Sequence, residues 1–257
     1  MKNLYDHPKY YEIAFSFRDI KREVDVFEEC FRRYSKIPVR RALELGSGNS
    51  PHLEELARRG YEYLGLDINP VMLDYAQKRA EAHGISATFM QADMRHFSLE
   101  TPVDFVYVML ASLFTESTED VLSHFSAVAK ALKAGGLYFL DWCVNFQWGD
   151  MSDVREQSWT MEKEEVKVDV RVLNEGVIDR VAQINQHKIL ADVDDHGKQI
   201  HLENVEVGRT IFPQEFLLLV EKSKKFEFIG WWNNWSLEEP IEKAARIDRP
   251  ITLIRRI

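Results

Sequence analysis

The sequence predicts an α/β protein with a doubly wound, mostly parallel sheet, an inserted small antiparallel β-sheet and a C-terminal antiparallel hairpin. Short apolar strands alternate strictly with helical segments from residue 41 to residue 142, an order typical of a parallel sheet with helices on both faces. Between residues 155 and 211, apolar residues instead alternate with charged ones, which indicates half-exposed antiparallel strands. Two apolar strands, 226–232 and 251–257, come last and should pair as the hairpin.

These patterns divide the 257 residues into three parts. We expect an N-terminal lid and helix over residues 1–40, a ligand-binding α/β domain formed by residues 41–142 and 212–257, and an inserted antiparallel sheet over residues 143–211. The first part ends in an amphipathic helix, 19–35, whose apolar residues recur at helical spacing.

Within the α/β domain, each element follows from a local pattern. Ser50 is a good N-cap, and Pro51 suits the first turn of a helix that ends near Gly60. The segment 103–110 is almost wholly apolar, as expected for a strand buried on both faces. We predict the other strands at 41–45, 61–66, 87–91 and 137–142, and the other helices at 70–83, 118–132 and 213–222.

Three or four antiparallel strands are expected in the inserted sheet. Turn-forming residues separate the alternating segments at 174–176 (NEG) and at 194–197 (DDHG). The sheet could form one wall of an acceptor site or a dimerisation surface, and both uses fit the pattern.

Charge and composition exclude several classes of protein. The net charge is −9, and the Lys and Arg clusters are short, so we expect no nucleic-acid partner. The longest apolar runs are too short to span a membrane, and the N-terminus lacks the features of a signal peptide. We expect no metal site. The two cysteines lack the spacing of metal ligands, and the three histidines of the inserted region match no ligand pattern: His187, His196 and His201. A cytoplasmic location follows as the simplest expectation.

The chemistry is expected at one edge of the parallel sheet. Gly46 and Gly48 join the first strand to its helix, where a tight turn lets a ligand approach the backbone. The second strand delivers Asp67 about 20 residues later, where a carboxylate can accept ribose hydroxyls. The third strand delivers Asp93 to the same edge. These residues all follow the carboxyl ends of neighbouring strands, where open α/β sheets bind ligands.

Two cofactor classes fit such an edge. A dinucleotide requires Gly-x-Gly-x-x-Gly and a pyrophosphate on the helix N-terminus, but the third glycine would fall on Pro51, which has no amide proton. S-adenosylmethionine has no phosphate to hold and tolerates this loop.

Four segments carry a resemblance to a known family: 44–48 (ELGSG), 64–73 (LGLDINPVML), 91–95 (QADMR) and 134–139 (AGGLYF). In order and spacing they resemble class I S-adenosylmethionine-dependent methyltransferases, which have a Rossmann-like fold. The segment from Tyr5 to Asp19 is similar to the N-terminal lid of small-molecule members. The sheet inserted after the fifth strand resembles that of sugar N,N-dimethyltransferases and glycine N-methyltransferase-like enzymes.

The resemblance implies a role for each position. Gly46 and Gly48 would line the methionine part of S-adenosylmethionine, Asp67 would bind the ribose, and Ile68 and Met72 would pack on the adenine. The remaining implied contacts are Asp93 and Met94 at the adenine amino group, Leu110 and Ala111 beside the transferring methyl, and Tyr11 and Arg18 closing over the cofactor, with Arg18 at its carboxylate. Glu44 belongs to the same site and replaces the commoner aspartate; Ser50 replaces a frequent third glycine.

The function implied is methyl transfer to a small-molecule acceptor, at nitrogen or oxygen, by in-line displacement. A hydroxyl acceptor would benefit from a general base. Asp141, His7, His96, His124 and Glu116 are candidates, and none is singled out, so the catalytic residue is unknown at this stage.

Other functions stay open. A nicotinamide-dependent oxidoreductase is the enzyme alternative, and a non-catalytic S-adenosylmethionine-binding protein is the alternative without turnover. Methylation of nucleic acid is disfavoured because the fourth strand ends without the Pro-Pro-aromatic or Pro-Cys signatures of base methylation. A homodimer is compatible with the sequence.

Overall fold

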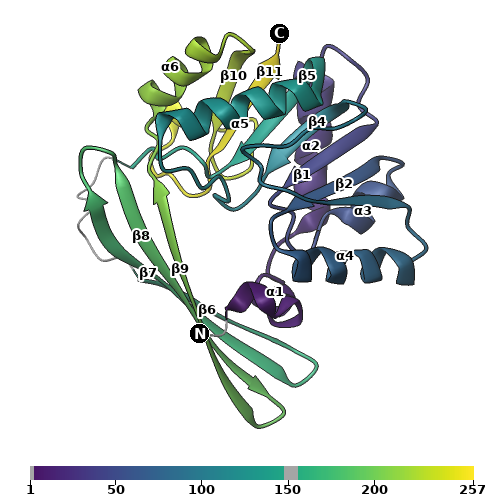
Figure 1. Ribbon diagram of the computed structural model, residues 1–257, viewed down its shortest axis with the longest axis vertical. Helices are drawn as coiled ribbons and strands as arrows, with labels where there is room; N and C mark the ends of the chain where they lie inside the picture. Colours follow the sequence, from purple (N-terminus) through teal and green to yellow (C-terminus); the bar gives the residue numbers. More distant parts are fainter. Residues whose placement is uncertain (1–2, 148–155) are drawn as a thin grey trace.

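The computed structural model describes residues 3–147 and 156–257, and it contains two sheets (Figure 1). The main sheet has seven strands in the order β10-β11-β5-β4-β1-β2-β3. Their bounds are β1 Arg41–Leu45, β2 Glu62–Asp67, β3 Ala87–Gln91, β4 Val103–Val108, β5 Leu132–Asp141, β10 Phe226–Trp232 and β11 Ile251–Arg256. The first five strands pair in parallel, whereas β11 lies antiparallel to β5 and to β10. The predicted fold class, including the C-terminal hairpin, is confirmed.

Helices cover both faces of this sheet. Apolar side chains of α2 (Ile20–Tyr34), α3 (Leu53–Arg58) and α4 (Pro70–Ala82) share one buried cluster with the strands. Those of α5 (Thr118–Ala131) and α6 (Pro213–Ser223) form the cluster on the other face. Every residue of β4 is buried, because the strand lies in the middle of the sheet between both helical layers.

The prediction that Ser50 caps a helix beginning at Pro51 is wrong. The helix α3 begins at Leu53, and His52 occupies the N-cap position without a side-chain hydrogen bond to the helix. Ser50 has a left-handed backbone, with φ of 54°, and its N–H donates to the Ser47 carbonyl at 2.7 Å. An N-cap residue normally has an extended backbone, so the tight turn at Ser50 delays the helix by two residues.

Strand β5 also differs from expectation at its start. It begins at Leu132 rather than at residue 137, because Leu132 already pairs with Val103 across a bulge between β4 and β5.

The inserted sheet has four antiparallel strands: β6 Glu156–Lys163, β7 Val166–Asp179, β8 Ile184–Asp195 and β9 Lys198–Arg209. The turn predicted at 194–197 is confirmed, and the Asp194 carboxylate accepts the Gly197 N–H at 2.7 Å. The turn predicted at 174–176 is wrong. Strand β7 runs through Asn174 and Gly176, and the register shift between them is a bulge at which Gly176 has a φ of 104°.

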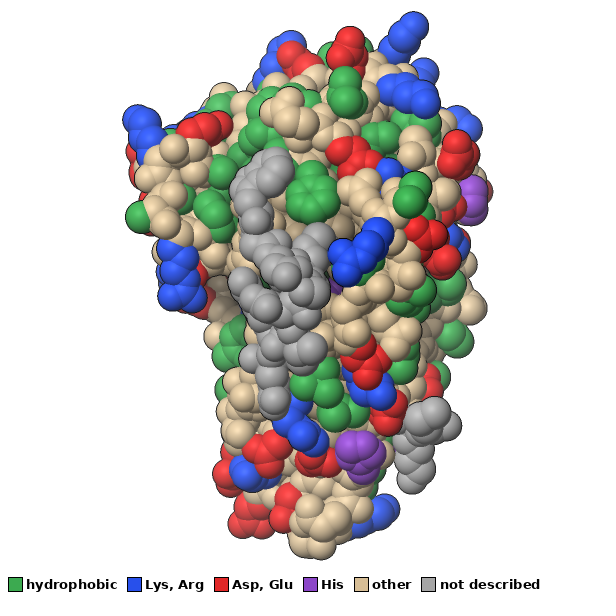
Figure 2. All heavy atoms as spheres, turned by 90° about the vertical axis from the view of Figure 1, so that its left-hand side faces the viewer, with side chains coloured by type: hydrophobic (Ala, Val, Ile, Leu, Met, Phe, Trp, Pro, Cys, Tyr) green, Lys and Arg blue, Asp and Glu red, His purple; other side chains and the backbone are tan. Residues whose placement is uncertain are grey.

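The N-terminal segment packs on this inserted sheet. It consists of a 3₁₀ turn, η1 (Leu4–Asp6), and the helix α1 (Pro8–Ala14). Ile13 and Ala14 are buried against the valines of β7, and the indole N–H of Trp159 donates to the Ala14 carbonyl at 2.7 Å. Figure 1 shows α1 between the inserted sheet and α4. Figure 2 shows acidic and basic side chains interspersed over the end of the molecule where the hairpins of this sheet project.

Candidate functional site

The carboxyl ends of β1 and β2 are joined through the glycine loop. Gly46 and Gly48 both have left-handed backbones, with φ of 62° and 51°. A Cβ atom on Gly46 would lie 3.2 Å from the Met94 side chain and 3.3 Å from that of Ser112, so glycine is required for conformation and for space. The Gly48 N–H donates to the Asp67 carboxylate at 2.7 Å. The loop and the end of β2 therefore hold one another in place.

A pocket of about 400 Å³ opens at this edge, between the strand ends, the N-terminal segment and β9. Eight residues proposed from the sequence line it: Tyr11, Gly46, Gly48, Asp67, Ile68, Met72, Asp93 and Met94. Glu116, a candidate base from the sequence, also lines it, and nine further lining residues escaped the sequence argument: Asn3, Tyr5, Leu66, Asn69, Ala92, Arg95, Ser112, Phe114 and Val207. The edge is the point where the order of parallel strands reverses between β1 and β4, as the general rule for open α/β sheets predicts.

Asp67 presents an oriented carboxylate to this pocket. One oxygen accepts the Gly48 N–H, and the other accepts the Asn69 N–H at 2.8 Å. Burial raises the pKa of Asp67 above its usual range and outweighs these backbone hydrogen bonds. Within residues 3–147 and 156–257, no Lys, Arg or His forms an ion pair with it.

Asp93 has an ionic partner that the sequence did not predict. Arg95 donates from Nε to both carboxylate oxygens at 3.0 Å and from its terminal nitrogen to one of them at 2.7 Å. These hydrogen bonds hold the pKa of Asp93 below its usual range. The spacing of two residues could have indicated this pair, because Arg95 follows Asp93 in the same loop.

The wall opposite the glycine loop comes from elements distant in sequence. Tyr5 and Tyr11, with ring centroids 5.6 Å apart, belong to η1 and α1, and Val207 belongs to β9. The Tyr5 hydroxyl donates to the carboxylate of Glu206, and the Asn69 side chain donates to the Tyr5 carbonyl at 3.0 Å. Only the tertiary structure brings these residues to the pocket, because no local motif links β9 to the N-terminal segment.

Two of the proposed cofactor residues lie in a buried polar network instead of the pocket lining. Glu44 accepts the Tyr63 hydroxyl at 2.6 Å and contacts His52 Nδ1 at 3.0 Å. Arg18 donates to Glu23 at 2.5 Å, and this carboxylate also contacts His52 Nε2 at 2.9 Å. Although burial opposes it, the contacts with His52 and Arg18 hold the pKa of Glu23 far below its usual range.

The other two, Leu110 and Ala111, lie just beyond the end of β4 with left-handed backbones. The Leu110 N–H donates to the Asp141 carboxylate at 2.8 Å, and the Ala111 N–H donates to the Asp141 carbonyl at 3.0 Å. Asp141 therefore sets the path of the chain from β4 into the pocket wall at Ser112.

Among the candidate bases, only Glu116 lines the pocket. Asp141 is fully buried in an ion pair with Arg249 at 2.6 Å. His124 is fully buried between the Met94 carbonyl and the Tyr138 hydroxyl. His7 stacks on Tyr10 at the start of α1.

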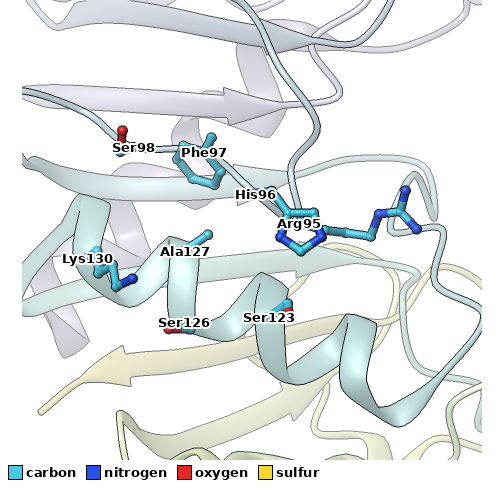
Figure 3. A pocket seen from close by; sticks show the side chains of 8 residues that line it. All are labelled: Arg95, His96, Phe97, Ser98, Ser123, Ser126, Ala127 and Lys130. Atoms are coloured by element: carbon cyan, nitrogen blue, oxygen red, sulfur yellow. The ribbon is translucent and has the colours of Figure 1, made fainter.

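The fifth candidate, His96, lies in a second pocket of about 450 Å³ between α5 and the loop after β3 (Figure 3). Its lining includes Lys130, Ser123 and Ser126 on one side of α5, while Arg95 is shared with the first pocket. Figure 3 shows the His96 ring close to the helix and the Arg95 side chain extending away from it.

The described part of the chain holds no group of three or more acidic, His or Cys side chains placed to bind a metal ion. None of its helices has the length and apolar character needed to span a membrane.

Comparison with known proteins places these observations in a family context. Residues 42–136 match the family model described as a methyltransferase domain. A provisionally named methyltransferase of Geobacillus sp. strain WCH70 is 29% identical over 115 residues, which are 44% of this chain and 47% of that protein. The match thus spans less than half of this curated relative.

Solved structures extend the similarity to nearly the whole chain. An S-adenosylmethionine-dependent methyltransferase from Clostridium acetobutylicum aligns with a TM-score of 0.76 at 18% identity, covering 96% of this chain and 95% of that one. An amino pentose methyltransferase from Micromonospora echinaspora, with S-adenosylmethionine bound, aligns with a TM-score of 0.70 at 19% identity, covering 96% of both chains. At these identities the likeness establishes the fold.

Proposed function

We propose that the protein transfers the methyl group of S-adenosylmethionine to a small molecule, and the match of residues 42–136 to a methyltransferase domain supports this. The cofactor is S-adenosylmethionine. Gly46 and Gly48 would hold its methionine part, Asp67 its ribose hydroxyls, and Ile68, Met72 and the Asp93 loop its adenine.

One observation carries this proposal above all. Asp67 is a partly buried carboxylate, held by the backbone N–H groups of Gly48 and Asn69, at the strand edge where open α/β sheets bind ligands. The loop itself offers little to a pyrophosphate, because Pro51 has no amide proton and α3 has only six residues and begins at Leu53. The same site therefore favours a phosphate-free nucleoside cofactor over a nicotinamide dinucleotide.

The reaction needs alignment more than it needs a covalent partner. The acceptor's lone pair attacks the methyl carbon, the carbon–sulfur bond breaks, and its electron pair stays on sulfur. Holding both reactants in line can supply much of the acceleration. Leu110 and Ala111, fixed by Asp141, and the N-terminal segment with Tyr11 are the parts of the chain that would hold them.

Support for a small acceptor comes from the walls of the pocket. The N-terminal segment and Val207 of β9 line it together with the strand ends, and a hollow with walls on more than one side favours a small acceptor over a polymer. The likeness to an amino pentose methyltransferase over 96% of the chain agrees with this class of acceptor. Methylation at nitrogen and methylation at oxygen are both consistent with such an acceptor.

Calorimetric titration tests the proposal. We expect the wild-type protein to bind S-adenosylmethionine with micromolar affinity and NAD not at all. Asp67→Ala should weaken binding at least tenfold, because two hydrogen bonds to a charged group are lost. Asp74→Ala is the matched control: this carboxylate lies on the exposed face of α4, paired with Lys78, and its loss should change nothing. If neither S-adenosylmethionine nor its demethylated product binds, the proposal fails.

A further inference from the structure

Glu206 of β9 is a partly buried carboxylate without an ionic partner in the described part of the chain. It accepts hydrogen bonds from the Tyr5 hydroxyl and, at 3.1 Å, from the Asn204 side chain, both of which are neutral groups. Three residues earlier on the same strand, Glu203 forms an ordinary ion pair with Lys188 at 3.1 Å. Glu206 therefore differs from Glu203 in that no Lys, Arg or His of the described residues forms an ion pair with it.

The Glu206 carboxylate lies behind the tyrosine wall of the pocket. Tyr5 and Tyr11 line the pocket, and the negative charges of both Glu206 and Asp67 contribute to the raised pKa values of the two phenols, after the larger effect of burial. A Cβ atom on Gly48 would lie 3.9 Å from the Tyr11 ring. Glu206 is not itself a lining residue of the pocket, and the Tyr5 hydroxyl connects it to the pocket wall.

The charge of this space is unbalanced. The pocket is lined by the carboxylates of Asp67, Asp93 and Glu116, and its one lining cation, Arg95, is engaged by Asp93. Burying a carboxylate without a counter-ion is unfavourable, and burial raises the pKa of Glu206 accordingly. A carboxylate beside two tyrosine rings is a favourable environment for an ammonium group.

We propose that Glu206, held by Tyr5, is a specificity-determining residue that binds the ammonium form of an amine acceptor, so that the protein methylates nitrogen. The inference rests on the proposed function. The ammonium transfers one proton to Glu206, and the neutral amine then attacks the methyl carbon. The carbon–sulfur electron pair stays on sulfur, the product is a methylated ammonium with a neutral thioether, and Glu206 releases its proton to water.

The positive group that binds Glu206 could belong to the acceptor or to the cofactor itself. Three ligands distinguish these two sources. S-adenosylmethionine carries an α-ammonium and a sulfonium. Its demethylated product, S-adenosylhomocysteine, keeps the α-ammonium alone. The analogue sinefungin keeps the α-ammonium and carries a second amine in place of the transferring methyl, which points toward the acceptor.

The experiment compares the affinities of these ligands for wild type, Glu206→Gln and Glu203→Gln by calorimetry. We expect Glu206→Gln to bind sinefungin about tenfold or more weakly, and to bind the other two ligands as wild type does. The retained binding also shows that the variant is folded. Glu203→Gln, which faces Lys188, should match wild type for all three ligands.

Three results overturn the inference and leave the proposed function standing. Equal losses for all three ligands in Glu206→Gln would assign the carboxylate to the cofactor's own ammonium, and a matching loss for S-adenosylmethionine and sinefungin alone would assign it to the sulfonium. An unchanged sinefungin affinity would remove Glu206 from the site. Failure of the wild type to bind any of the three ligands is a different result, which overturns the proposed function itself.

Discussion

At the scale of single residues, His124 shows how a buried polar side chain supports the pocket without entering it. The Met94 carbonyl can only accept, so His124 Nδ1 carries the proton of that 2.9 Å hydrogen bond, and Nε2 accepts the Tyr138 hydroxyl at 2.6 Å. The contact with Tyr138 requires the neutral ring, because Nε2 can accept a hydrogen bond only when it carries no proton. Burial lowers the pKa of His124 to about 4, so this histidine fixes the position of Met94 and is unavailable as a base.

The free energy of unfolding should therefore decrease as the pH falls, because His124 is neutral in the folded protein. Because the folded-state pKa is below the usual value, the unfolded chain binds more protons between about pH 6.5 and pH 4, and stability is lost as the pH falls through that window. At pH 5 the loss attributable to His124 is about 2 kcal/mol. Urea unfolding at pH 7.5 and pH 5 should show a shallower pH dependence for His124→Gln than for wild type. The exposed His83→Gln is the control, and equal slopes for wild type and His124→Gln would contradict this account.

At the scale of elements, α1 is part of the inserted sheet's core rather than a free lid. Ile13 and Ala14 are buried with the valines of β7, and Tyr10 donates to the Asp195 carboxylate at 2.8 Å. The helix has only seven residues, too few to be stable alone. Its position, and with it the position of Tyr11 in the pocket, depends on that sheet.

Ile13→Ala should loosen α1 without unfolding the main sheet. Deleting a buried isoleucine side chain costs about 2–4 kcal/mol, and the loss falls on a helix of only seven residues. We expect faster protease cleavage within residues 8–14 and weaker binding of S-adenosylmethionine, with the global unfolding midpoint nearly unchanged. Lys9→Ala, on the exposed side of the same helix, should resemble wild type. Unaltered cleavage of Ile13→Ala would show that α1 is held by other contacts.

At the scale of the whole molecule, one guanidinium joins three distant parts of the chain beneath the pocket. Arg249, in the segment before β11, contacts the Asp141 carboxylate of β5 at 2.6 Å and that of Glu23 in α2 at 2.9 Å. It also lies 4.5 Å above the Trp235 ring. Asp141 is 0% and Glu23 4% exposed, so removing the cation would leave two buried carboxylates short of a partner.

Arg249→Leu should lower the free energy of unfolding by about 3–5 kcal/mol, because breaking a buried ion pair from one side leaves uncompensated charge. Denaturant titration measures this. Arg246→Leu removes a largely exposed guanidinium from the same segment and should cost under about 1 kcal/mol. A loss of that small size for Arg249→Leu would mean that the network contributes little to stability.

The amino-acid sequence by itself determined the fold class and the edge where the site forms. Strand and helix periodicity and turn chemistry are local, so the order of β1–β5 and the hairpin of β10 with β11 could be predicted. The positions of Gly46, Gly48, Asp67 and Asp93 followed, because the carboxyl ends of neighbouring parallel strands must meet at one edge. Local signals were insufficient at Ser50 and at Asn174, where a tight turn and a bulge replaced a helix cap and a hairpin.

Only the tertiary structure decided what faces the glycine loop across the pocket. Tyr5 and Glu206 are 201 residues apart, and the Glu23, Asp141 and Arg249 network likewise joins three separate segments. Such contacts arise from the packing of the N-terminal segment and the inserted sheet, which the periodicity of either segment does not encode. The glycine-loop side of the pocket follows from local strand and loop patterns. The opposite side depends on side chains brought together by long-range packing.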